Sequence, residues 1–217
     1  MSDPKQRLTP DEVAAAGLDD WRQLVGALHA RFQTKGFDKG LVLVDRIGAA
    51  AEAANHHPDV TLTWPAVEIR LSSHDVGGIT SRDLDLARTI SAYAAEAGIA
   101  SDVAGLTVVE QGLDTHDAGE VTPFWAAILG READRGEVPG APYVPTVWFQ
   151  DSERLAEAPP QRWHPDVWVP RDQAESRIDA ALAAGGTLVS DAEAPSFWVL
   201  ADPQGNKACI CTSAERS

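Results

Sequence analysis

Two hydrophobic periods divide the first half of the chain into helices and strands. From Phe37 to Ala54 apolar residues return every three or four positions, which predicts an amphipathic helix, and Pro58 then ends it. From Thr61 to Ser73 apolar and charged residues alternate, which predicts a strand with one buried face. Thr80 opens another helix that runs to about Ala97, where a glycine stops it. The apolar positions of the first helix are Phe37, Leu41, Val44, Ile47, Ala51 and Ala54, and those of the strand are Val67, Ile69 and Leu71.

The chain before these elements predicts a short capped helix and a hairpin. Thr9 is placed to cap a helix that starts at Pro10, and Glu12 completes a capping box. Residues 21–36 alternate weakly, which suits a hairpin. The apolar face of that hairpin carries Leu28, Ala30 and Phe32.

The second half of the chain contains an internal repeat. Each copy reads as a strand, a helix that ends at a glycine, and a further alternating apolar stretch. The two stops, Gly130 and Gly185, lie about fifty-five residues apart, which indicates two copies of one supersecondary unit sharing a core. The expected segments are 108–113, 120–129 and 144–149 in the first copy, and 163–169, 172–184 and 197–200 in the second.

Composition and charge narrow the classes of protein. The chain has 217 residues, 44% of them hydrophobic, and a formal charge of −15, which argues against nucleic acid and anionic membranes as partners. No apolar run approaches the length of about 18 residues that would suggest a membrane span, and the polar N-terminus lacks a signal-peptide core. The two cysteines, Cys209 and Cys211, are two residues apart in an expected strand. They would therefore lie on the same face of that strand, where they are poorly placed to form a disulfide with each other. We therefore expect a cytoplasmic protein.

Three of the six histidines lie close together in the sequence, at His56, His57 and His74. Histidine donates and accepts protons near neutral pH, so the cluster suits an acid–base elimination or addition. A metal site is less favoured, because adjacent residues rarely direct both rings at one ion. Each position also has a structural alternative: Asp83 can complete a capping box, the adjacent histidines can complement a helix dipole, and Glu52 can form an ordinary helical pair.

These positions resemble the pterin-4a-carbinolamine dehydratase family over roughly residues 8 to 97. Ser73 stands where that family usually has threonine, and it keeps the hydroxyl. The matching motifs are Glu52-x-x-Asn55-His56-His57-Pro58-Asp59, then Trp64-x-x-Val67-x-Ile69-x-Leu71-x-Ser73-His74-Asp75, and Gly77-Gly78-Ile79-Thr80-x-x-Asp83.

The resemblance implies dehydration of 4a-hydroxytetrahydrobiopterin to quinonoid dihydropterin, a step of tetrahydrobiopterin recycling, without cofactor or metal. An acid must protonate the departing hydroxyl while a base takes a proton from a ring nitrogen. His57 and His74 are expected to be this pair, with His56 positioning the hydroxyl. Asp83 is expected to orient a histidine or the pterin ring. The residues expected around the substrate are Glu52, Pro58, Trp64 and Ser73.

The C-terminal segment from Leu200 to Cys209 resembles the last hairpin of glyoxalase-like (vicinal oxygen chelate) proteins, in which two βαβββ units form a cup. Metal-dependent members usually place a carboxylate where Lys207 stands, and a cation there repels a metal ion. His164 lies in the other expected ligand region, but a lone histidine in a strand is more often a packing or surface residue.

The first repeat offers only Gln111 and Gln150 toward the expected cup, and amides are poor metal ligands. We therefore expect a metal-free cup that takes a second small-molecule ligand. Its tryptophans either line the cup or belong to an ordinary core.

Together these patterns predict an α+β protein of two domains, 1–100 and 101–217. The first is expected to hold an antiparallel sheet covered on one face by helices, and the second a paired βαβββ glyoxalase-like module. Two other functions stay open. One is a non-catalytic dimerisation or interaction module, and the other is a protein whose second domain carries the main activity. A pterin is the expected small-molecule partner, and homo-oligomer formation is also open.

Overall fold

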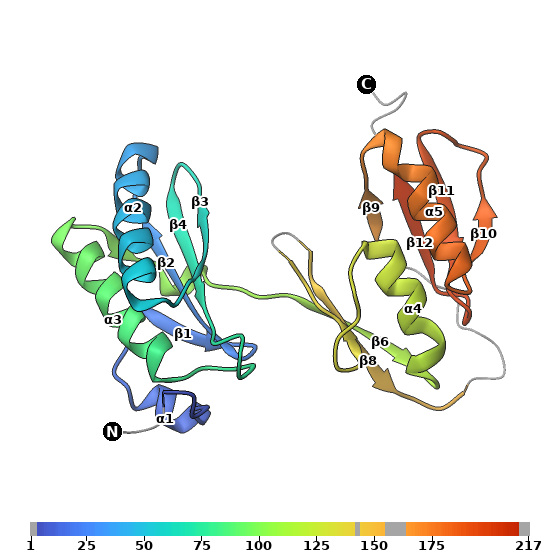
Figure 1. Cartoon of the computed structure of the whole chain (residues 1–217). Coiled ribbons are helices and arrows are strands. Elements are labelled where there is room, and N and C mark those ends of the chain that lie inside the picture. Colours follow the sequence, from blue (N-terminus) through green and yellow to red (C-terminus); the bar gives the residue numbers. More distant parts are fainter. Residues whose placement is uncertain (1–3, 142–143, 155–163, 213–217) are drawn as a thin grey trace. The chain divides into compact units, whose positions relative to one another are not determined.

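The chain forms two compact units, Met1–Val108 and Val109–Ser217, each with its own hydrophobic core. The computed structural model describes residues 4–141, 144–154 and 164–212 (Figure 1). Within these ranges no helix combines the length and the apolar character needed to cross a membrane. The boundary follows Val108, whereas the sequence patterns placed it after residue 100.

The first unit is a five-stranded antiparallel sheet in the order β1-β2-β4-β3, with the short strand β5 also paired to β2. Helices α2 and α3 lie on one face of this sheet (Figure 1), as the sequence predicted. Its elements are α1 (Pro10–Ala14), β1 (Trp21–Leu24), β2 (Ala27–Gln33), α2 (Phe37–Ala54), β3 (Asp59–Leu62), β4 (Ala66–Leu71), α3 (Ser81–Glu96), β5 (Ala100–Ser101) and the 3-10 turn η1 (Val103–Gly105).

Most local predictions for this unit are confirmed. Thr9 and Glu12 form the capping box of α1, β1 and β2 form the hairpin, and α2 begins at Phe37 and ends at Ala54. The stretch from Thr61 to Ser73 was expected as one strand and is instead mostly a hairpin of β3 and β4. Pro65 lies in the turn between them, where its missing N–H costs no sheet hydrogen bond.

The buried stripe of α2 differs from the predicted one. Phe37 and Leu41 are exposed, and Gly40 takes their place against the sheet. A Cβ on Gly40 would lie 2.4 Å from Cδ1 of Leu62, so the missing side chain allows α2 to approach β3 closely. The helix residues that are buried are Gly40, Leu43, Ile47 and Ala51.

The second unit contains both copies of the repeat around one shared core, with α4 and α5 packed against each other. Its elements are β6 (Glu110–Thr115), α4 (Ala118–Leu129), β7 (Glu137–Val138), β8 (Thr146–Asp151), β9 (Asp166–Trp168), the 3-10 turn η2 (Arg171–Gln173), α5 (Ala174–Ala183), β10 (Thr187–Ser190), β11 (Phe197–Ala201) and β12 (Lys207–Cys211). The sheets have the orders β6-β8-β7 and β10-β11-β12-β9, and the first strand of each copy pairs in parallel with the last.

The second copy is a complete βαβββ unit, whereas the described part of the first copy has one strand fewer than predicted. Among the described residues between α4 and β8, β7 is accompanied by isolated bridges at Asp134 with Glu137 and at Ala141 with Val144. Pro139 and Pro145 interrupt this stretch, and proline cannot donate to a strand ladder. Trp163, expected at the start of a strand, lies outside the described residues.

The turn between β11 and β12 is fixed by a buried carboxylate. Asp202 accepts hydrogen bonds from the backbone N–H of Gln204 and Asn206 and from the side-chain amide of Asn206. It also accepts one from the indole Nε1 of Trp125 on α4, at 3.0 Å. The Asp-Pro-x-Gly-Asn motif therefore joins the last hairpin to the helix layer.

Candidate active site

A buried hydrogen-bond network centred on Asp83 joins three of the predicted site residues. One oxygen of its carboxylate, Oδ1, lies 2.7 Å from Nε2 of His56. The other, Oδ2, accepts from the hydroxyl of Ser73 at 2.7 Å and from the backbone N–H of Thr80 at 2.7 Å. A carboxylate accepts hydrogen bonds when it is ionised, so in that form of Asp83 the Nε2–H of His56 is the donor of this bond. Both Asp83 and His56 are buried.

The end of α2 directs the two adjacent histidines to opposite environments. Asn55 adopts a left-handed conformation, with φ 46° and ψ 43°, and its N–H bonds the carbonyls of the last helical turn. The N–H of His56 then bonds the carbonyl of Ala51 at 3.0 Å, which turns the chain back toward the core. As a result His56 is buried, whereas the side chain of His57 is 54% exposed.

His74 lies in a tight turn between β4 and α3. The backbone carbonyl of Ser73 accepts from the N–H groups of Val76 and Gly77, and the N–H of Ser73 donates to the carbonyl of Gly78. Gly77 has φ 64°, which suits a residue without a side chain. The turn leaves His74 exposed while Ser73 points into the network.

Two cations hold the outer side of this turn. The carboxylate of Asp75 lies 2.7 Å from Nη2 of Arg82 and 3.4 Å from Nζ of Lys5. The hydrogen bond from Arg82 is the main cause that holds the pKa of Asp75 below its ordinary value, and Lys5 acts in the same direction. The turn that carries His74 is thus attached to the first turn of α3 and to the N-terminal segment.

The remaining predicted residues fall into two groups. Glu52 lies 3.2 Å from Nε2 of His57, and Pro58 follows directly in the chain, so both lie beside the exposed histidine. Trp64 has an exposed side chain and follows the C-terminal end of β3, whereas His56 and His57 precede its N-terminal end. The four residues of this strand span roughly 13 Å, which separates Trp64 from these histidines.

The arrangement therefore presents two exposed histidines, each one residue away from a member of the buried network. His57 follows His56, and His74 follows Ser73. Imidazoles held on a rigid support are suited to proton transfer with a bound molecule. Sequence reasoning missed the hydroxyl of Thr80, which lies 2.9 Å from that of Ser73, and the clamp on Asp75. The only sequence signal for the Thr80 hydroxyl was the Thr-x-x-Asp spacing of a helix capping box, and that spacing does not reveal burial.

The second unit has its own group of polar and aromatic side chains on the sheet face away from the helices. Trp148 lies over Gly112, where a Cβ would meet its ring at 2.9 Å, and Trp168 is exposed on the other sheet. Trp125 and Trp198 belong instead to the core. The expectation that both Gln111 and Gln150 face a cup is wrong, because Gln111 pairs with the core residue Val147 and therefore shares its face, opposite to that of Gln150.

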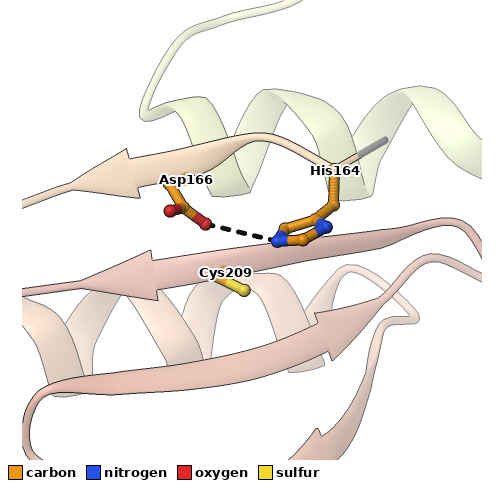
Figure 2. A group of neighbouring side chains, drawn as sticks. All are labelled: His164, Asp166 and Cys209. Carbon is orange, nitrogen blue, oxygen red and sulfur yellow. Dashed lines mark ion pairs between the residues drawn. The ribbon is translucent and has the colours of Figure 1, made fainter. Parts of the chain in front are cut away.

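Three side chains that commonly bind metals meet where β9 and β12 pair. Figure 2 shows His164 and Asp166 extending toward Cys209 of the neighbouring strand. Their ligand atoms all lie within 4.8 Å of one another, and Nε2 of His164 is 3.6 Å from Oδ1 of Asp166. The set comprises one nitrogen, one oxygen and one sulfur donor. Lys207, which the sequence placed at the ligand position, is not part of it.

The sequence of the first unit is similar to that of known proteins. The family model described as pterin 4 alpha carbinolamine dehydratase matches residues 6–93. A protein of Thermosynechococcus vestitus named "Putative pterin-4-alpha-carbinolamine dehydratase" is 42% identical over 88 residues, which are 40% of this chain and 93% of that protein. The chain belongs to the pterin-4a-carbinolamine dehydratase family. A protein of the same name from Nocardia farcinica is 40% identical over 89 residues, covering 40% of this chain and 94% of its own length.

Beyond this dehydratase-family unit, the chain carries a glyoxalase-like domain, because the family model of that description matches residues 110–211. Among solved structures, a transcriptional coactivator/pterin dehydratase of Brucella melitensis is 29% identical and covers 41% of this chain and 99% of its own, with a TM-score of 0.40. A glyoxalase/bleomycin resistance protein/dioxygenase family enzyme of Burkholderia phytofirmans is 17% identical and covers 46% of this chain and 94% of its own, with a TM-score of 0.38.

Proposed function

We propose that the first unit removes water from a 4a-hydroxytetrahydropterin. The proposal rests on the dehydratase family together with one observation: the buried pair of His56 and Asp83 supports two exposed histidines, His57 and His74. Hydroxide is a poor leaving group, so the reaction requires both a proton donor and a proton acceptor beside the substrate.

In the proposed reaction, one of the exposed histidines protonates the 4a-hydroxyl as its carbon–oxygen bond breaks. The other accepts a proton from a ring nitrogen, so that water and quinonoid dihydropterin leave while the enzyme keeps its total number of protons. The second histidine then releases its proton to solvent and the first takes one up, which restores the initial state. His56 positions the hydroxyl through its second ring nitrogen, since Asp83 holds the first. Glu52 orients His57, and Ser73 acts through Asp83, because its hydroxyl is buried in the network.

The test is to follow the decay of enzymatically generated 4a-carbinolamine with and without the protein. His57→Ala and His74→Ala should each lower turnover by roughly ten- to ten-thousandfold, which brackets the usual contribution of positioned acid–base groups. Folding should change little, because both side chains are exposed. His29→Gln, on the opposite face of the same sheet, is the matched histidine control and should keep the wild-type rate.

The same assay decides against the proposal in two ways. Wild-type protein that does not accelerate the decay would favour a non-catalytic interaction module. Two single variants that keep the wild-type rate would remove the histidines from the mechanism while leaving the activity in place.

A second candidate function belongs to the glyoxalase-like domain. Trp148 and Trp168 lie on two different sheets, each on the face away from the core, which favours binding of a planar or apolar small molecule beside them. Quenching of tryptophan fluorescence by a ligand in the full chain, lost in Trp148→Leu or Trp168→Leu, would support this role. A ligand whose binding is unchanged in both variants would exclude these faces.

A further inference from the structure

The three metal-binding side chains of the second unit are held together by the backbone. Asp166 lies directly opposite Cys209 in the parallel pairing of β9 with β12. The N–H of Cys209 donates to the carbonyl of Pro165 at 3.0 Å, which places the cysteine between His164 and Asp166. Neighbouring Ala208 and Ile210 belong to the core, so alternation directs Cys209 and Asp166 to the other face.

The distances suit one small ion. Zinc binds nitrogen and oxygen at about 2.0–2.2 Å and thiolate at about 2.3 Å, so tetrahedral ligand atoms lie roughly 3.3–3.8 Å apart. The imidazole and the carboxylate already have this separation, at 3.6 Å. The sulfur lies within 4.8 Å of both, so a movement of about 1 Å completes the set.

Burial and charge also favour a cation. Cys209 is buried at the base of the group, while the side chains of His164 and Asp166 are 53% and 48% exposed, which leaves one side open to solvent. A thiolate, a carboxylate and a neutral imidazole carry two negative charges, which a divalent ion neutralises. The mixture of sulfur, nitrogen and oxygen donors selects a zinc-like transition ion over magnesium or calcium.

We propose that His164, Asp166 and Cys209 bind one divalent transition ion of the zinc class and leave one coordination position open. The site departs from the expected metal-free cup. That expectation assigned the ligand position to Lys207, but Cys209 provides the ligand atom, two residues and about 7 Å farther along the strand. The proposal is independent of the dehydratase reaction of the first unit.

Cobalt(II) titration of the untagged, chelator-treated full chain tests the site. One equivalent should bind and produce a thiolate-to-cobalt charge-transfer band together with visible bands of a tetrahedral ion, and zinc should displace it. Cys209→Ser should abolish the charge-transfer band. His164→Ala and Asp166→Asn should each weaken binding by more than about 100-fold, since even residues that only orient metal ligands contribute 10–100-fold.

Cys211→Ser is the matched control, because Cys211 is buried on the same face of β12 but lies outside the group. It should keep the band and the affinity. If circular dichroism shows that Cys209→Ser does not fold, the test rests on the His164 and Asp166 variants, because these side chains are half-exposed and their loss should not prevent folding. A charge-transfer band that is absent from the wild type, or unchanged in the His164 and Asp166 variants, would overturn the proposal, as would weak binding that no variant alters.

Discussion

At the scale of single residues, one carboxylate both caps a helix and holds a histidine. Asp83 bonds the N–H of Thr80 in the capping box of α3 and also holds Nε2 of His56. A buried carboxylate is costly by several kcal/mol unless its oxygens are hydrogen-bonded, and both oxygens are satisfied here. The sequence allowed either role, but it could not show that one side chain fills both, because that depends on where α2 ends relative to α3.

Asp83→Asn tests this double role. An amide places an N–H₂ group against one of the donors, so the free energy of unfolding should fall by about 1–3 kcal/mol. Dehydratase turnover should fall by roughly ten- to thousandfold, because His56 loses the carboxylate that holds its ring in place. Asp85→Asn, on the exposed side of the same helix, should leave both quantities unchanged. Wild-type turnover in the Asp83 variant would contradict the proposed positioning.

His29 allows a test of how stability depends on pH. It is partly buried and lies on the sheet face opposite to the helices. Burial is the main cause that lowers its pKa, and the nearby charge of Arg70 acts in the same direction. A lowered folded pKa means that the unfolded chain binds the proton more readily. The stability contributed by the neutral ring should therefore be lost as pH falls below about 6.5 toward the lowered pKa.

Urea unfolding of the wild type and of His29→Gln between pH 7 and pH 5 measures this effect. The variant cannot take up the proton, so its free energy of unfolding should depend less steeply on pH across that interval. Equal slopes for the two proteins would show that His29 does not contribute.

Ser73 and Trp64 show which part of the site the sequence could not give at this scale. Both are expected to contact the substrate, which stays a prediction, but the sequence did not reveal that Ser73 is buried in the Asp83 network and that Trp64 lies beyond the far end of β3. A motif gives the spacing of residues along the chain. It does not give the direction of a side chain that follows a tight turn.

At the scale of elements, periodicity predicted the helices well and their buried faces less well. The limits of α2 are those expected from the sequence, but Gly40 occupies the position closest to the sheet while Leu41 faces solvent. Glycine has no hydrophobic signal, so a pattern of apolar residues cannot reveal a contact that depends on a missing side chain. The β3–β4 hairpin was missed for a related reason, since the alternation of apolar residues continues through its turn.

The end of α2 is the element that sets the directions of the histidines. Asn55 has φ 46°, a conformation that costs most residues about 1–2 kcal/mol and glycine little. Asn55→Ala should therefore lower the free energy of unfolding by about 1 kcal/mol and reduce turnover, whereas Asn55→Gly should keep both near the wild type. Chemical unfolding measures the stability of the two variants, and the dehydratase assay measures their turnover. Equal behaviour of the two variants would show that the left-handed conformation does not matter.

At the scale of the whole molecule, two families meet in one chain, and the sequence predicted both from different signals. The first unit was predicted from motifs with specific spacing, and the second mainly from a repeat near fifty-five residues. The junction was harder to place, because β5 is only two residues long. It pairs with Phe32 and Gln33 of β2, and Asp102 lies 2.9 Å from Nε of Arg31. These contacts attach residues 100–102 to the first unit.

The last prediction concerns separation of the two units. A fragment of residues 1–108 keeps β5 and Asp102, so it should fold and carry the dehydratase turnover of the full chain. A shorter fragment of residues 1–99 keeps the core residue Ile99 but loses the β5 pairing and Asp102, one of the two carboxylate partners of Arg31, and its free energy of unfolding should be lower by roughly 1–3 kcal/mol. Urea unfolding and carbinolamine decay, measured on both fragments and on the full chain, compare them directly. A fragment 1–108 that is folded but inactive would show that the reaction needs the glyoxalase-like domain. A short fragment as stable as the long one would show that residues 100–102 add nothing to the first unit.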